Sequence, residues 1–163
     1  MILYHGSNIE IENINLECGR RGKDFGQGFY LCADRQQAMK MAERTVAREE
    51  VGVPTITAYS FDENNLITPS ALNVKIFEKC SAEWAEFILL NRQNRTRQQA
   101  HTFDIVYGPI ADDKIGLQLS RYQLRYIAMD ELVRQLTFIH PTFQYFFGTE
   151  IAISLLEKVK ENE

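Results

Sequence analysis

Residues 22–34 read Gly22-Lys23-Asp24-Phe25-Gly26-Gln27-Gly28-Phe29-Tyr30-Leu31-Cys32-Ala33-Asp34, and they set the architecture. Closely spaced glycines run directly into an apolar, aromatic segment, which predicts a tight loop followed by a strand over 28–32. Four of the nine glycines lie within residues 19–28, a density typical of a loop that bends sharply or approaches a ligand. Upstream, the apolar segment 1–4 ends in His5-Gly6-Ser7. Two strands with special residues at their ends are therefore expected.

The rest of the chain alternates strands and helices irregularly. The patterns predict further strands over 54–61, 103–107 (stopped by Gly108-Pro109) and 143–147, and extended pieces over 8–18 and from Leu66. Asp34 and Ser81 cap predicted helices that end near Arg48 and Arg92, residues 130–136 form a short helix, and Thr149 opens a final amphipathic helix through Val159. Without regular βαβ spacing, this order favours an α+β split sheet over a doubly wound fold.

Length and composition indicate one ordinary globular domain over residues 1–163. The chain is 45% hydrophobic and 25% charged, and its formal net charge of −4 argues against a broad electrostatic grip on nucleic acid. Neither a signal peptide nor an apolar run of roughly 18 residues is found, so no membrane contact is expected. Cys18, Cys32 and Cys80 lack disulfide-like or zinc-like spacing, which predicts reduced thiols in the cytoplasm and no metal site.

These motifs resemble the ADP-ribosyltransferase superfamily, in particular its diphtheria-toxin and poly(ADP-ribose)-polymerase branch. Members carry W/Y-H-G-S/T and then F-G-x-G-I/F-Y-F/L-A-D, which residues 4–7 and 25–31 match, with Ala33-Asp34 following after one extra residue, Cys32. The pattern is also similar to a small bacterial group of domains of unknown function, with G-K-D-F-G-x-G-F-Y and, later, D-I-V-x-G-P-x-A-D-D, matched by 104–113. The resemblance spans nearly the whole chain. It implies a split β-sandwich of two antiparallel half-sheets with flanking helices, packed face to face with NAD as substrate in the cleft between them.

His5 and the two residues after it form the first part of the NAD site that the resemblance implies. In the family this histidine holds the adenosine ribose, the backbone of the next residue, here Gly6, grips the nicotinamide amide, and Ser7 matches the small hydroxyl. A histidine at a strand end can donate one ring N–H to a ribose hydroxyl while the backbone fixes its other nitrogen. A single histidine is more often structural, and that alternative stays open.

Tyr30 is the second position. Its ring can stack on nicotinamide, and the positively charged pyridinium adds a cation–π contribution of around 1 kcal/mol. Because strand side chains alternate, we expect Phe29 to point inward and Tyr30 to face the cleft. The alternative is that one of the two simply belongs to the core. Met41, or else Met39, is expected to form the opposite wall of the nicotinamide site.

The third position is the family's catalytic glutamate at the start of a late strand. Gln144 stands there in Gln144-Tyr145-Phe146-Phe147, and Gln123 is a competing match. An amide oxygen can accept a hydrogen bond from the nicotinamide ribose, but losing the charge costs a few kcal/mol of transition-state stabilisation. Mono-ADP-ribosylation or NAD hydrolysis fits this better than chain elongation. Glu150 is a candidate for the missing carboxylate, although it also suits the first turn of a helix.

Loop residues complete the expected cofactor site. Lys23, together with Arg20 and Arg21, has the charge that suits the NAD pyrophosphate, and the resemblance places Phe25 and Gly28 of the same loop at the cofactor. Either these cations contact phosphate or they are ordinary surface charges.

Two further charged segments have open roles. Asp112 or Asp113 either orients the ribose or the acceptor, or is a solvated turn acid. Arg92, Arg95 and Arg97, with His101, form either a docking surface for an acidic target or a solvated helix end.

The sequence leads to three hypotheses. The main one is an NAD-dependent mono-ADP-ribosyltransferase that modifies a protein or nucleic acid acceptor, of the kind found as bacterial toxins with an antitoxin or in phage defence. The second is an NAD- or ADP-ribose-binding module with weak or no activity, or an NAD glycohydrolase. The third is NAD-dependent removal of an RNA 2′-phosphate, for which more converging Arg and His residues are expected, or modification of a nucleic acid base, for which the run from Arg92 to Arg97 could guide the strand.

Overall fold

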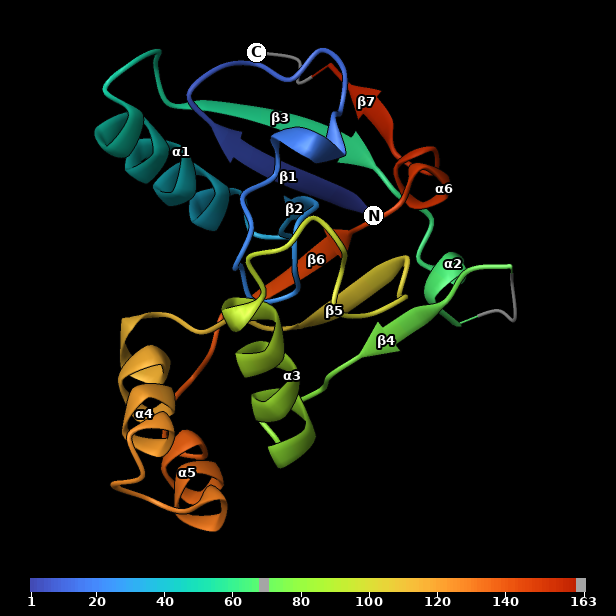
Figure 1. The fold of residues 1–163 in the computed structure, drawn as a ribbon. Coiled ribbons are helices and arrows are strands. Elements are labelled where there is room, and N and C mark those ends of the chain that lie inside the picture. Colours follow the sequence, from blue (N-terminus) through green and yellow to red (C-terminus); the bar gives the residue numbers. More distant parts are fainter. Residues whose placement is uncertain (68–70, 161–163) are drawn as a thin grey trace.

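Two β-sheets form the framework of the protein in its computed structural model, which describes residues 1–67 and 71–160 (Figure 1). The first sheet has the order β1–β3–β7, made of Ile2–Ser7, Thr55–Ser60 and Glu157–Val159. The second has the order β2–β6–β5–β4, made of Phe29–Leu31, Phe143–Phe147, Ile105–Pro109 and Val74–Ile76. The α+β class is confirmed. The half-sheets are antiparallel except that β4 pairs with β5 in parallel, so the second sheet is mixed.

One apolar cluster joins the two sheets. Leu3 of β1 packs in it with Phe29, Leu31 and Phe147 of the second sheet, and all four are at most 8% exposed. The backbones of the sheets meet at an isolated bridge between Tyr4 and Cys32, with N–O distances of 2.8 and 3.0 Å. Beyond this bridge β1 and β2 form no further backbone ladder, and the space between them belongs to the cleft described below.

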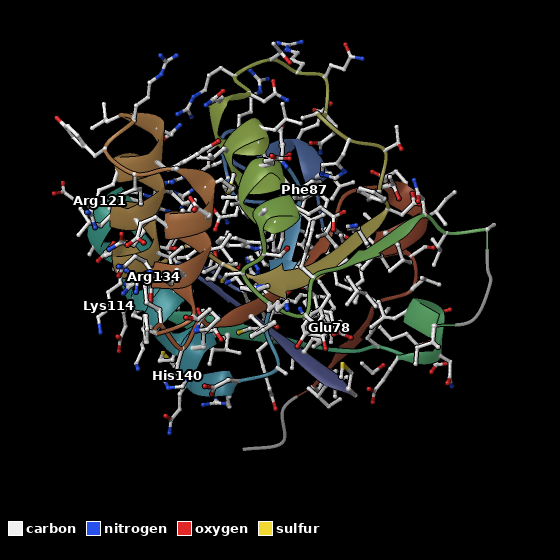
Figure 2. The ribbon with its side chains drawn as sticks, turned by 90° about the horizontal axis from the view of Figure 1, so that it is seen from below. Glu78, Phe87, Lys114, Arg121, Arg134 and His140 are labelled. Carbon is white, nitrogen blue, oxygen red and sulfur yellow. The ribbon has the colours of Figure 1, made fainter. Side chains whose placement is uncertain are left out.

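A second apolar cluster lies between the second sheet and three helices, α3 (Ala82–Gln93), α4 (Asp113–Gln123) and α5 (Met129–Leu136). Phe146 of β6 and Trp84 of α3 are fully buried in it. Alternation along β6 turns Phe146 to these helices and Phe147 to the first cluster. Figure 2 looks onto this helical layer, with Phe87 on α3 and the basic Arg121 and Arg134 on α4 and α5.

The two strongest helix predictions are confirmed. Asp34 caps α1 (Arg35–Glu49) through a hydrogen bond from the N–H of Gln36 at 2.8 Å, and Ser81 caps α3 through the N–H of Trp84 at 3.1 Å. Helix α1 lies against β1 through its buried Ala38 and Ala42. A Cβ atom on Gly6 would lie 1.9 Å from the carbonyl oxygen of Ala38, so this helix requires glycine in the strand.

The end of the chain differs from its prediction. The predicted final helix from Thr149 to Val159 is wrong, because α6 spans only Glu150–Ile153 and the chain then forms β7. Residues 157–159 pair antiparallel with 58–60 and cover the free edge of β3. The edge of β3 offers backbone hydrogen bonds to residues 157–159, and the helical spacing of apolar residues in this short segment does not reveal that pairing.

Other departures are local. Helix α2 (Asn64–Ile67) occupies part of the segment predicted to be extended from Leu66, and residues 8–18 contain the short 3-10 helix η1 (Leu16–Cys18) instead of a strand. Strand β5 does not stop before Gly108-Pro109 but continues through both residues, which pair with β6. Pro109 is tolerated at the end of the strand because only β6 pairs with it there. Helix α4 was not predicted, and Asp112 caps it through the N–H of Ile115 at 3.0 Å. None of the described helices is long and apolar enough to cross a membrane.

Candidate functional site

A cleft of about 980 Å³ opens between β1, β2, α1 and the glycine-rich loop 19–28. Its volume is at the upper end of the range for ligand sites in proteins. The predicted site residues that line it are His5, Gly6, Ser7, Lys23, Gly28, Tyr30, Met41 and Gln144. The single-pocket arrangement on which the sequence hypothesis depends is therefore present, with residues far apart in the chain brought to one site.

His5 is held by the second sheet. Its Nδ1 lies 2.8 Å from the carbonyl oxygen of Tyr30, and its ring stacks on Phe29 at 4.3 Å between centroids. A carbonyl oxygen only accepts hydrogen bonds, so Nδ1 carries the proton. Burial lowers the pKa of His5 to about 4, against the effect of this hydrogen bond and with a smaller contribution from nearby Lys23, so the ring is neutral at pH 7.

This tautomer reverses the role predicted for the imidazole. We expected a ring N–H to donate to a ribose hydroxyl, but the N–H is used by Tyr30. Nε2 of His5 is left as an acceptor, and it forms no hydrogen bond with the described residues. A ribose hydroxyl in the cleft would therefore donate to His5.

The backbone of Gly6 faces the same opening. Tyr4 exchanges both of its backbone hydrogen bonds with Cys32, and strand alternation turns the N–H and C=O of Gly6 to the same side. A continued ladder would pair Gly6 with Tyr30, but the Tyr30 carbonyl already accepts the His5 ring. The main chain of Gly6 thus presents one donor and one acceptor toward the cleft, as a carboxamide requires.

Tyr30 is fixed at its hydroxyl group. Its oxygen accepts a hydrogen bond from the N–H of Phe25 at 3.1 Å and donates one to the carbonyl of Gly26 at 2.7 Å. Gly26 has φ +98°, which favours glycine in this tight turn. The edge of Phe146 contacts the ring at 5.3 Å between centroids, and the Nζ atom of Lys23 lies 3.9 Å from the ring centroid. Both Tyr30 and Phe29 are buried, on opposite faces of β2.

Gln144 lines the cleft from β6, one of the two inner strands of the second sheet. It lies opposite Gly108 in the β5–β6 register, is 6% exposed, and shares a face of β6 with Phe146. The structure places the other candidates for this role elsewhere. Glu150 is an exposed residue in the first turn of α6, and Gln123 ends α4. Neither of them lines the cleft.

Two predicted cofactor residues also lie outside the cleft. Phe25 is fully buried beneath the glycine-rich loop, where its ring packs against Phe87 and Phe146. Asp112 is exposed and caps α4, so it performs the structural role that the sequence left as its alternative. Met39, the second choice for the nicotinamide wall, does not line the cleft, whereas Met41 does.

Sequence reasoning missed Asp24, which anchors the glycine-rich loop. Its Oδ1 accepts from Nε of Arg92 at 2.7 Å, and its Oδ2 accepts from the N–H of Ala111 at 2.7 Å. His101 donates from Nε2 to the carbonyl of Phe25 at 2.7 Å, because its Nδ1 accepts the N–H of Phe103. The sequence did offer a signal for this ion pair: an acidic residue, Asp24, inside the glycine-rich motif and a run of arginines that begins at Arg92. Arg92 therefore has a structural role as the partner that anchors the loop.

The comparisons with known proteins identify a family. A family model described as "Protein of unknown function (DUF3990)" matches residues 1–158. The chain belongs to the DUF3990 family. Neither the curated proteins nor the solved structures contain a match to the chain. In this DUF3990 fold, no group of three or more His, Cys, Asp or Glu residues within the described ranges is arranged to hold a metal ion.

Basic side chains gather along one wall of the cleft. Lys23, Arg20 and Arg48 all line it, and within the described residues Lys23 has no carboxylate within ion-pair distance. Burial, with Arg20 next in effect and Arg48 adding to it, lowers the pKa of Lys23 to about 8, although Asp24 opposes the shift. Arg48 is paired with Glu49 at 2.9 Å, whereas Lys23 and Arg20 form no ion pair among the described residues. These two cations, with Arg48 beside them, favour an anionic ligand such as a phosphate.

Proposed function

We propose that the cleft binds NAD and that the protein is an NAD-dependent mono-ADP-ribosyltransferase. The observation that carries this proposal is the convergence of His5, Tyr30 and Gln144 on one cleft. These are the three positions at which the superfamily resemblance expects its NAD-binding and catalytic groups. The cleft is large enough for a dinucleotide and has a cationic wall, a flat aromatic side and an unpaired backbone segment.

Each group has a role that its chemistry supports. Nε2 of His5 accepts a hydrogen bond from a ribose hydroxyl, and the N–H and C=O of Gly6 pair with the nicotinamide carboxamide. Tyr30 and Met41 form the walls of the ring site, near Ser7. Arg20, Lys23 and Arg48 face the two phosphates, since opposite charges favour this arrangement. The side chain of Gln144 accepts from a hydroxyl of the nicotinamide ribose.

The reaction breaks the bond between the ribose C1′ and the nicotinamide nitrogen. The bonding electrons leave with nicotinamide, which departs neutral, and an oxocarbenium-like ribose forms. A nucleophilic oxygen or nitrogen of the acceptor, or of water, then bonds to C1′ and loses its proton. Rigid positioning of nicotinamide and of the ribose hydroxyls lowers the barrier. Gln144 supplies no charge to the developing cation, which limits the rate and favours a single transfer over chain elongation.

The biological setting is proposed from the resemblance. We place the protein in the cytoplasm, where NAD is present and where free thiols such as Cys18 stay reduced. Its acceptor is a protein or a nucleic acid, and an antitoxin protein would restrain it, as for bacterial toxins of this type. No membrane partner is required by this chemistry.

The experiment is a turnover assay. The protein is incubated with NAD labelled in its adenosine part and with cell extract, and both label transfer and free nicotinamide are measured. Transfer at subsaturating NAD that falls in His5→Asn but is retained in Lys40→Met, a control on the exposed face of α1, supports the proposal. Absence of both label transfer and nicotinamide release, in protein whose circular dichroism shows an intact fold, contradicts it.

A binding module without turnover is the second candidate, and Gln144 in place of a carboxylate is the observation that favours it. Calorimetry beside the turnover assay separates the two functions. NAD binding that weakens roughly tenfold in His5→Asn, combined with no nicotinamide release from the unmutated protein, identifies the module. Nicotinamide release without label transfer identifies an NAD glycohydrolase.

A further inference from the structure

Lys23 differs from the other basic residues of the cleft because its ammonium lies on an aromatic face. Its Nζ atom is 3.9 Å from the centroid of the Tyr30 ring. The ring cannot move away easily, since its hydroxyl is hydrogen-bonded to both Phe25 and Gly26 and the ring packs against Phe146. A cation at this distance from a buried aromatic face is attracted by the ring.

In the proposed function, nicotinamide stacks on this same ring of Tyr30. Phe25 and Phe146 pack on the side of Tyr30 that belongs to the buried cluster, so that side offers no room. An aromatic ligand in the cleft must therefore take the position of the Lys23 ammonium. An aromatic ligand and the Lys23 ammonium therefore compete for the same face of the Tyr30 ring.

When Lys23 is displaced from the ring, its ammonium gains a new ion-pair partner only if the ligand carries an anionic group. Arg20 and Arg48 line the same wall, and both repel its ammonium. Asp24, the adjacent carboxylate, is bound to Arg92 and to the backbone of Ala111. The carboxylates that line the cleft are also paired, Glu49 with Arg48 and both Glu10 and Glu12 with Lys158. A phosphate between the three cations would give the ammonium a new partner, whereas a ligand without phosphate would leave it desolvated and unpaired.

We propose that Lys23 is a specificity residue that couples the aromatic site to the phosphate site: nicotinamide attached to phosphates displaces it from Tyr30, and free nicotinamide does not. The inference rests on the proposed function for the identity of the ligand. Its consequence is that, after the glycosidic bond breaks, Lys23 returns to the ring and expels nicotinamide. Product inhibition by nicotinamide is thereby reduced.

The test measures binding of two probes, nicotinamide and ADP-ribose, to wild-type protein, Lys23→Met and the control Lys40→Met. Nicotinamide is expected to bind Lys23→Met roughly fivefold more tightly than wild type, the factor that corresponds to a cation–π contact of about 1 kcal/mol. ADP-ribose is expected to bind the same variant roughly fivefold more weakly, because one phosphate partner is gone. Lys40→Met changes neither affinity.

The pH dependence adds an independent readout. Nicotinamide affinity of the wild type is expected to rise as the pH passes through about 8, where Lys23 loses its charge, and to stay constant in Lys23→Met. Of the groups that face Lys23, His5 on β1 and Tyr30 on β2 are neutral there, and Asp24 is paired. The guanidinium groups of Arg20 and Arg48 do not titrate in proteins.

Three outcomes overturn the inference. One is an unchanged nicotinamide affinity in Lys23→Met, and another is weaker binding of both probes. If either is found while the wild type still releases nicotinamide from NAD, the proposed function stands and this inference falls. The third is that neither probe binds any of the proteins, which overturns the inference and the NAD site together. Opposite changes of the two probes without any turnover would support the inference and defeat the enzyme function.

Discussion

Lys23 and Asp24 are neighbours in the glycine-rich loop, and they serve opposite sides of it. Lys23 faces the cleft, where its ammonium lies on the Tyr30 ring without a carboxylate partner in the described residues. Asp24 faces the body of the protein, where its carboxylate is 12% exposed and binds Arg92 and Ala111. One side of the loop is anchored and the other is left available. We therefore expect fold stability to depend on Asp24 and ligand binding to depend on Lys23.

The largest expected effect comes from breaking the anchored side. Asp24→Asn removes the charge that pairs with Arg92 and is expected to lower the free energy of unfolding by about 2–3 kcal/mol. Lys23→Met should change it by less than about 1 kcal/mol, because among the described residues the ammonium has the ring of Tyr30 as its one close partner. Urea denaturation measures both. Glu131→Gln, which breaks the surface pair with Arg134, is the matched control and should have no measurable effect. Equal losses in Asp24→Asn and Lys23→Met would contradict the comparison.

The next largest effect is expected in the cleft that Lys23 faces, at Gln144 on β6. Gln144→Glu introduces the carboxylate that an oxocarbenium-like ribose lacks here, and nicotinamide release is expected to rise by a factor of about 10–100. A single-turnover assay with saturating NAD measures it. Gln144→Leu, of similar volume, should lower the rate instead. A rate in Gln144→Glu at or below that of wild type would show that this position does not face the reacting ribose.

A smaller effect is expected at His5. Asparagine can still donate to the carbonyl of Tyr30 but lacks the acceptor that Nε2 presents, so His5→Asn should weaken NAD binding roughly tenfold, as for one lost hydrogen bond. Calorimetry measures the affinity, and thermal unfolding checks that the fold is kept. Unchanged affinity in a folded variant would assign His5 to structure alone.

The smallest effect is a dependence of stability on pH. Burial lowers the pKa of both His5 and His101, so each stabilises the fold as a neutral ring. This contribution is complete above the unfolded pKa of about 6.5 and is lost as the pH falls toward the folded pKa, which is about 4 for His5. Unfolding free energy should fall by about 1–2 kcal/mol between pH 7 and pH 4.5. The slope should flatten in His5→Asn, and an equally steep slope there would argue against a buried neutral imidazole.

Much of the framework could be predicted because its signals are local. Asp34 and Ser81 have the side chains that cap helices, and a run of aromatic residues identifies the strand at 143–147. Strand β7 could not be found in this way, since it depends on the free edge of β3 about 100 residues earlier. Helix α4 was hidden by the Gly108-Pro109 pair and by Gly116, which are typical of loops.

The candidate site was predictable where a motif lies beside its function. His5, Gly6, Tyr30 and Gln144 line one cleft, as expected from their motifs. The tautomer of His5 depends on a carbonyl 25 residues away, and the ring contact of Lys23 depends on the conformation of the loop. Such properties follow from three-dimensional contacts that residue types alone do not contain.

The backbone amide of Gly6 gives the most direct test of the central claim, that NAD binds between β1 and β2. Nuclear magnetic resonance can follow the exchange of this amide hydrogen and of the Leu119 amide in α4, with and without NAD. We predict that saturating NAD slows exchange at Gly6 by at least tenfold and leaves Leu119 unchanged, because a carboxamide would accept the Gly6 N–H. No change at Gly6, with NAD bound elsewhere or not at all, would contradict the account.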